Sequence, residues 1–194
     1  MERLGFEPEV VVSDIPEQIR DGESAADYTD RLARQKAADV VSKLAGETGY
    51  SNWLLAADTV VTLDDALLEK PRDEAEAVDM LEKLSGSRHK VITSFCWMSR
   101  GSDARSVRRV ETFVDFRQLE RETVERYAAT GEPLDKAGGY GIQDIGSAFV
   151  REVEGSYFAV VGLPVCEVVE ELEALGGLSE YPFLPLAEGR ADAT

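Results

Sequence analysis

Segments with the apolar spacing of helices alternate with segments patterned as strands along this chain, and no other feature constrains the fold as strongly. Residues 25–44 repeat apolar side chains at helical spacing, and Ser24 is the expected N-cap. Residues 53–63, WLLAADTVVTL, have the apolar and β-branched character of a buried strand. Because such elements interleave, the sequence predicts an α/β protein with a mixed β-sheet.

The same alternation continues toward the C-terminus. Further strands are expected at residues 90–99 and 106–119, and residues 147–164 are expected to form a β-hairpin that turns at 154–156. Further helices are expected at residues 73–86, at 120–131 and from Pro164 onward. We expect one domain over residues 1–178, followed by a loosely held C-terminal tail over residues 179–194.

Composition and charge exclude several classes of protein. Of the 194 residues, 38 are acidic and 21 are basic, and the net charge of −17 argues against a nucleic-acid-binding surface. No apolar run reaches the roughly 18 residues of a membrane span, and the first residues do not resemble a signal peptide. Cys96 and Cys166 are expected to be buried free thiols in a cytoplasmic protein. The single histidine, His89, is expected on the surface, which argues against a Ser–His–Asp triad.

Asp58 and Thr59 interrupt the apolar strand predicted at residues 53–63. A carboxylate is costly in an apolar strand unless it is paired or bound to a metal ion, so Asp58 is a candidate functional residue. The alternative is an aspartate at a strand end whose oxygens accept hydrogen bonds from backbone N–H groups. The local sequence leaves both interpretations open.

Two lysines are also candidates. Lys36 lies on the same apolar helical stripe as Val40, where a lysine either reaches the rim or neutralises a buried anion. Lys70 follows Asp58 by twelve residues across an expected turn at 64–65, so a returning strand would bring the two side chains together. The alternative for Lys70 is an ordinary surface lysine.

A glycine-rich stretch, GEPLDKAGGYGIQ, occupies residues 131–143. Its glycines at positions 138, 139 and 141 allow positive φ angles, and their N–H groups could form an anion-binding nest together with Lys136. Gln143 carries both a donor and an acceptor, which is the combination needed to recognise the edge of a nucleobase. The alternative is an ordinary glycine turn.

Seven short segments are distributed in order along residues 1–164, and each resembles a motif of one protein family. They are MERLGFEPEVVVSDIPE, RLARQKA, AADTVV, LEKPRD, LSGSRHKV, GEPLDKAGGYGIQ and VVGLP. Together they resemble the Maf family of nucleoside triphosphate pyrophosphatases. The DKAGGYGIQ form is similar to the branch that acts on dTTP and UTP, rather than to the 7-methyl-GTP branch. This resemblance implies an α/β fold with an elongated mixed β-sheet flanked by helices, and two lobes around a central cleft as in ITPase-like proteins.

The resemblance also implies roles for individual residues. Asp58 would be the general base, and Glu17 with Asp58 would hold a divalent cation, Mg²⁺ or Mn²⁺. The residues expected to bind the nucleoside triphosphate are Glu17, Lys36, Thr59, Lys70, Lys136 and Gln143. Of these, Thr59 and Gln143 would contribute to base preference. The implied reaction is hydrolysis of dTTP or UTP to the monophosphate and pyrophosphate, in a house-cleaning enzyme that forms a homodimer.

Three departures from the family pattern accompany the resemblance. A segment of the form SxSPRR, whose arginines face the nucleotide in the family, has no counterpart here, so we expect weakened activity and reduced stability for the chain as written. Asp144 stands where the family usually has glycine, and Ala159 where asparagine commonly precedes VVGLP. Two alternatives stay open: a catalytically impaired nucleotide-binding protein in cell-division control, and a pyrophosphatase of purine or 7-methyl-GTP nucleotides.

Overall fold

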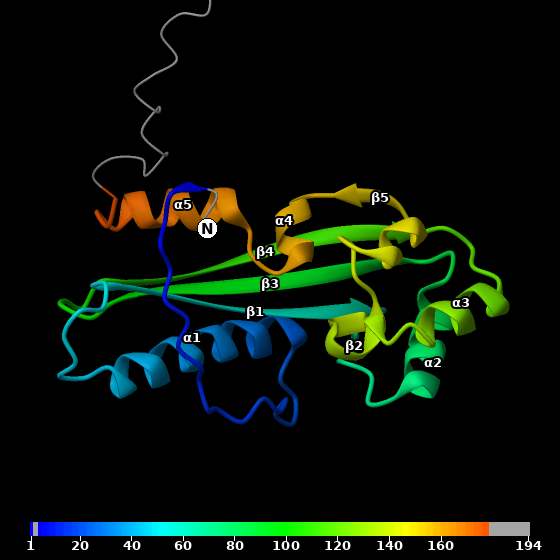
Figure 1. The fold of residues 1–194 in the computed structure, drawn as a ribbon, viewed down its shortest axis with the longest axis horizontal. Helices are drawn as coiled ribbons and strands as arrows, with labels where there is room; N and C mark the ends of the chain where they lie inside the picture. Colours follow the sequence, from blue (N-terminus) through cyan, green and yellow to red (C-terminus); the bar gives the residue numbers. More distant parts are fainter. Residues whose placement is uncertain (2–3, 179–194) are drawn as a thin grey trace, which may run out of the picture.

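The structure, a computed structural model, describes residue 1 and residues 4–178. Its centre is a five-stranded sheet with the strand order β2-β1-β3-β4-β5 (Figure 1). The strands are β1 (Trp53–Leu63), β2 (Ala66–Leu68), β3 (Arg88–Ser99), β4 (Arg105–Phe116) and β5 (Val150–Glu154). The tail predicted at residues 179–194 lies outside the described residues.

The α/β class is confirmed, but all the pairings between these five strands are antiparallel, so the sheet is not mixed. Short connections join β1 to β2 and β3 to β4, and such connections can only reverse the direction of the chain. A parallel pair would need a long crossover that returns to the same end of the sheet. Interleaving of helices and strands therefore predicted the class correctly but not the strand direction.

Helices cover both faces of this sheet (Figure 1). They are α1 (Ala25–Lys43), α2 (Glu74–Leu84), α3 (Arg121–Ala128), α4 (Tyr157–Val161) and α5 (Val165–Ala174). Helix α1 lies along one face, and α4 and α5 lie on the opposite face. Helices α2 and α3 pack against each other beside β2. Two predicted caps are confirmed, because Ser24 accepts the N–H of Asp27 and Asp73 accepts the N–H of Glu76.

The apolar core is divided by the sheet. On the α1 face, Leu32 packs with Val60 and Ile92, and on the α5 face, Phe95 packs with Val168. The largest cluster lies at the β2 end of the sheet, where strand residues meet α2 and α3. None of the helices in the described part of the chain has the length and apolar character that a membrane span requires.

The hairpin predicted at residues 147–164 is wrong. Residues 150–154 form β5, but the chain then leaves the sheet and α4 follows. Gly155 has a φ of 122°, and Ser156 caps α4 by accepting the N–H of Ala159. Thr112 of β4 holds the bend, since its Oγ1 accepts the Ser156 N–H and donates to the Ser156 carbonyl. The apolar run after the turn thus packs as a helix on the sheet instead of extending it.

Two further predictions about side chains are corrected. His89 is buried, with 2% of its surface exposed, and its Nε2 lies 2.8 Å from the hydroxyl of Tyr140. The alternation of β3 turns His89 into the core, where it also packs edge-on against Phe116. Cys96 is a buried free thiol as predicted, but Cys166 is a free thiol exposed on α5.

Candidate functional site

The open edge of β1 forms the centre of a cleft. The short β2 pairs only with residues 61–63 of β1, so on this edge residues 53–60 have no strand partner among the described residues. Successive side chains of a strand point to opposite faces, so Asp58 points toward α1 and Thr59 toward α4. Both nevertheless line a single cleft of about 690 Å³, because the cleft wraps around the unpaired edge.

All seven residues predicted to act in the site line this one cleft. They are Glu17, Lys36, Asp58, Thr59, Lys70, Lys136 and Gln143. They come from the segment before α1, from α1 itself, from β1, from the chain after β2 and from the glycine-rich loop after α3. The fold therefore brings together positions that span more than a hundred residues of sequence.

Lys36 joins two carboxylates at the α1 side of the cleft. Its Nζ lies 2.6 Å from Asp58 Oδ1 and 2.8 Å from Glu17 Oε1. The Asp58 side chain is 9% exposed, and burial raises its pKa even though the Lys36 hydrogen bond acts in the opposite direction. Burial acts to lower the pKa of Lys36, but its hydrogen bonds to Asp58 and Glu17 outweigh burial and raise it. Of the two interpretations left open for each residue, Lys36 neutralises a buried anion, and Asp58 is paired with a side chain.

A tight turn carries Lys70 into the cleft. Asp64 and Asp65 both adopt positive φ angles, 48° and 65°, which is the conformation of a two-residue hairpin turn. The turn folds β2 back on β1, and Lys70 follows two residues after β2 ends. Its positive charge acts to lower the pKa of Asp58, as expected for a lysine on the same cleft.

The glycine-rich loop does not form the predicted anion nest. The N–H of Gly138 donates to the Glu69 carbonyl, and the N–H of Gly139 donates to the Lys136 carbonyl. The N–H of Gly141 donates to the hydroxyl of Tyr127. These three amides are therefore already occupied within the protein and are not free to bind an anion.

Gly141 instead makes room for Lys136. A Cβ atom on Gly141 would lie 2.8 Å from Cε of Lys136, so the lysine stem lies directly across this glycine. The Lys136 Nζ is 2.8 Å from Asp135 Oδ1, and both residues line the cleft. Asp144, the unusual residue after the loop, lines the cleft as well and adds a negative charge near its rim.

The described residues provide two convergent carboxylates for a cation. No group of three or more histidine, cysteine, aspartate or glutamate side chains within the described part of the chain could hold a metal ion. Glu17 and Asp58, however, both lie within hydrogen-bonding distance of one ammonium group, that of Lys36. Mg²⁺ is commonly bound by one or two carboxylates, with substrate phosphates and water completing its shell. The pair therefore fits a metal ion that is shared with a substrate.

Comparison with known proteins identifies the family of this chain. The family described as Maf-like protein matches residues 1–175. The chain belongs to the Maf family. It is 45% identical over 174 residues to a dTTP/UTP pyrophosphatase of Geobacter sulfurreducens, a match that covers 90% of this chain and 88% of the relative. It is 46% identical over 180 residues to a dTTP/UTP pyrophosphatase of Escherichia coli O157:H7, covering 92% and 87%.

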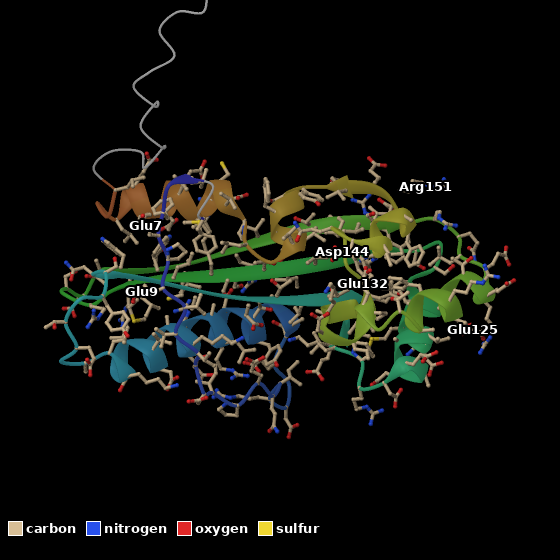
Figure 2. All side chains as sticks on the ribbon, in the orientation of Figure 1. Glu7, Glu9, Glu125, Glu132, Asp144 and Arg151 are labelled. Carbon is tan, nitrogen blue, oxygen red and sulfur yellow. The ribbon has the colours of Figure 1, made fainter. Side chains whose placement is uncertain are left out.

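Glu132 and Tyr127, which the sequence did not predict as site residues, hold the glycine-rich loop in place. Glu132 Oε1 accepts hydrogen bonds from the Tyr127 hydroxyl at 2.8 Å and from the Gly146 N–H at 3.0 Å. Its Oε2 accepts the Ile145 N–H at 3.1 Å. Figure 2 shows Glu132 near Asp144 at the β2 end of the sheet, whereas Glu7 and Glu9 lie toward the opposite end. Glu132 therefore anchors the segment that presents Gln143 to the cleft.

Tyr28 also lines the cleft, although the sequence did not predict it as a site residue. It belongs to α1, is 4% exposed and lines the cleft two turns before Lys36. An aromatic residue at apolar helical spacing is the usual signal of a core position, so periodicity alone could not distinguish it from Leu32.

Proposed function

We propose that this chain is a nucleoside triphosphate pyrophosphatase that hydrolyses dTTP and UTP to the monophosphate and pyrophosphate. The observation that carries the proposal is the Asp58–Lys36 pair, a buried carboxylate with a raised pKa held in a cleft that also collects Lys70 and Lys136. Two relatives that are named dTTP/UTP pyrophosphatase, and that match about nine-tenths of the chain, support these substrates.

Asp58 acts as the general base in this proposal. Its carboxylate accepts a proton from the water that attacks the α-phosphorus, and its burial gives it a more basic oxygen than a solvated aspartate has. The pyrophosphate leaving group gains negative charge as the phosphoanhydride bond breaks. Lys36, Lys70 and Lys136 lie in the cleft to balance that charge.

The cleft is lined by three lysines and by five carboxylates, those of Glu17, Asp58, Glu69, Asp135 and Asp144. The net charge of −17 is spread over the surface, and salt screens charges beyond about 8 Å. A triphosphate in the cleft is therefore governed by the charges that line it, and in this proposal a divalent cation joins the three lysines in offsetting the phosphate charge. Thr59 and Gln143 are the polar side chains that contact the nucleoside and set base preference in this proposal.

A divalent cation, Mg²⁺ or Mn²⁺, completes the proposed site, with Glu17 and Asp58 as its protein ligands. When bound, such an ion would polarise the phosphate oxygens and offset their charge. We further propose a cytoplasmic homodimer that does not bind nucleic acid. The acidic surface supports the last point, since phosphate backbones are bound by clustered basic side chains.

Comparing the turnover of wild type with that of the variant Asp58→Asn tests this proposal. The chain would be incubated with Mg²⁺ and either UTP, dTTP, CTP, ITP or 7-methyl-GTP, and release of pyrophosphate and monophosphate would be recorded. We expect UTP and dTTP to be hydrolysed and Asp58→Asn to lose about 100-fold or more in kcat. Asp79→Asn, which changes an exposed carboxylate on α2, is the matched control and should keep full activity.

Two results would contradict the proposal. Activity of Asp58→Asn close to that of Asp79→Asn would remove Asp58 from the role of base. A folded chain whose melting temperature rises with UTP but which releases no pyrophosphate would be the nucleotide-binding protein of the alternative interpretation.

A further inference from the structure

Two threonine hydroxyls form a chain that leads from the cleft into the core. Thr59 and Thr93 are directly opposite each other in the register of β1 and β3. Their Oγ1 atoms are 2.8 Å apart, and Thr93 Oγ1 lies 2.7 Å from the carbonyl oxygen of Ala159 at α4. Thr93 is fully buried, with 0% of its surface exposed, whereas Thr59 lines the cleft.

The direction of each hydrogen bond in this chain follows from counting protons. A carbonyl oxygen can only accept, so the single hydroxyl proton of Thr93 is donated to Ala159. The contact between the two threonines must then use the proton of Thr59, with Thr93 Oγ1 as the acceptor. The Thr59 hydroxyl consequently has no proton left for a ligand, and only its lone pairs are available to the cleft.

We propose that Thr93 is a positioning residue that determines specificity, because it makes the Thr59 hydroxyl an obligatory acceptor. This inference rests on the proposed function, and it names the chemistry required of the nucleotide: a hydrogen-bond donor facing Thr59. The N3–H of uracil or thymine is such a donor, whereas N3 of cytosine is an acceptor and would place lone pairs against lone pairs. Selection for imide bases thus originates in a residue that no nucleotide touches.

Gly162, the C-cap residue of α4, lies beside Thr59 in the cleft. Gly162 has a φ of 118°, which favours glycine, and a Cβ atom there would come to 3.7 Å from Thr59 Oγ1. The Ala159 carbonyl also accepts the N–H of Gly162 at 3.0 Å. Removing the Thr93 hydroxyl therefore leaves this carbonyl with one partner, which makes Thr93→Val a mild change for the fold.

The test compares kcat/KM for UTP and CTP in wild type, Thr93→Val and Thr93→Ser. In Thr93→Val the Thr59 proton loses its acceptor and can turn to the cleft, so we expect the UTP-to-CTP ratio to fall about tenfold or more. Thr93→Ser keeps the hydroxyl and should keep the ratio. In a Thr59→Val background, Thr93→Val should change the ratio no further, because the group through which it acts is gone.

Thr29→Val is the matched control for loss of a buried hydroxyl. Thr29 is also 0% exposed and donates to a main-chain carbonyl, that of Ala25 at 2.6 Å, but it lies outside the cleft. Its variant should leave the UTP-to-CTP ratio unchanged. A general effect of weaker packing would alter both valine variants alike, and that result would overturn the proposal.

A ribose hydroxyl is a second source of the same donor, and deoxynucleotides separate the two sources. If the sugar is the donor, Thr93→Val should alter the preference for UTP over its 2′-deoxy or 3′-deoxy analogue and leave the UTP-to-CTP ratio intact. An active Thr93→Val enzyme with all these ratios unchanged refutes the role of Thr93. Absence of pyrophosphate release by wild type refutes the proposed function instead, and calorimetric binding of UMP and CMP to the same variants then tests Thr93 separately.

Discussion

Replacing His89 with glutamine should remove a large part of the acid sensitivity of this protein's stability. His89 is the only histidine in the chain, and its burial lowers its pKa from 6.5 to about 4. Its Nδ1 is buried without a hydrogen-bond partner, and no carboxylate in the described structure offsets the burial that disfavours the charged ring. The folded protein therefore favours the neutral form of His89.

The size and sign of the effect follow from this shift. The unfolded chain binds a proton at His89 near pH 6.5, but the folded protein binds it only near pH 4, so stability falls as the pH drops through that window. Above pH 6.5 the contribution of His89 is complete. For a single site with these pKa values, the free energy of unfolding decreases by about 2 kcal/mol between about pH 7.5 and about pH 5.

Urea unfolding, followed by tryptophan fluorescence at both pH values, measures the effect. Wild type and His89→Gln have the same carboxylates. The difference between the free energies of unfolding that they lose on acidification is therefore the contribution of His89. Tyr140→Phe is the control, because it removes the hydroxyl that lies 2.8 Å from Nε2 but leaves a titratable ring in the core. It should keep the pH dependence of wild type. If His89→Gln loses as much stability on acidification as wild type does, the reasoning from burial is wrong.

Two further predictions concern the loop that carries Lys136 and Gln143. Glu132→Gln replaces one accepting oxygen with a donor that faces a backbone N–H, and should lower the free energy of unfolding by about 1–3 kcal/mol. The exposed Glu122→Gln on α3 should change it little, and equal urea midpoints for the two variants would contradict the anchoring role. Gly138→Ala should destabilise by about 1–3 kcal/mol, because φ is +72° and the new Cβ would lie 3.0 Å from the methyl groups of Val61. In differential scanning calorimetry, Gly138→Ala should cost less stability in a Val61→Ala background than in wild type, and an equal cost in both backgrounds would contradict the steric contribution.

Local features were predictable because they depend on neighbours in sequence. Ser24 and Asp73 cap the helices that follow them, and the strand at residues 53–63 has the predicted bounds. Asp58 was conspicuous because a carboxylate within an apolar strand needs a partner, and Lys36 because a lysine on an apolar helical stripe does too. Each residue pointed to a missing partner, and the structure pairs them at 2.6 Å.

Features that depend on contacts between distant segments were not predictable in this way. The predicted anion nest does not form because the N–H of Gly138 donates to the carbonyl of Glu69, about seventy residues earlier in the chain. The polar neighbours of His89 in sequence predict a surface position, whereas the alternation of β3 turns its side chain toward Tyr140. No local pattern revealed that residues 157–161 leave the sheet as a helix, since the bend is held by Thr112 of β4.

The sequence by itself determined the α/β class, the positions of most helices and strands, the family and seven of the residues that line the cleft. Only the tertiary structure decided that β2 stops short and leaves an edge of β1 open, so that Asp58 and Thr59 reach one cleft from opposite faces of the sheet. It also decided that Thr93 of β3 lies opposite Thr59 of β1, with their hydroxyl groups in hydrogen-bond contact. The physical reason is that periodicity and capping are set within a few residues, whereas strand register joins groups that are far apart in the chain and can be known only once those strands are paired.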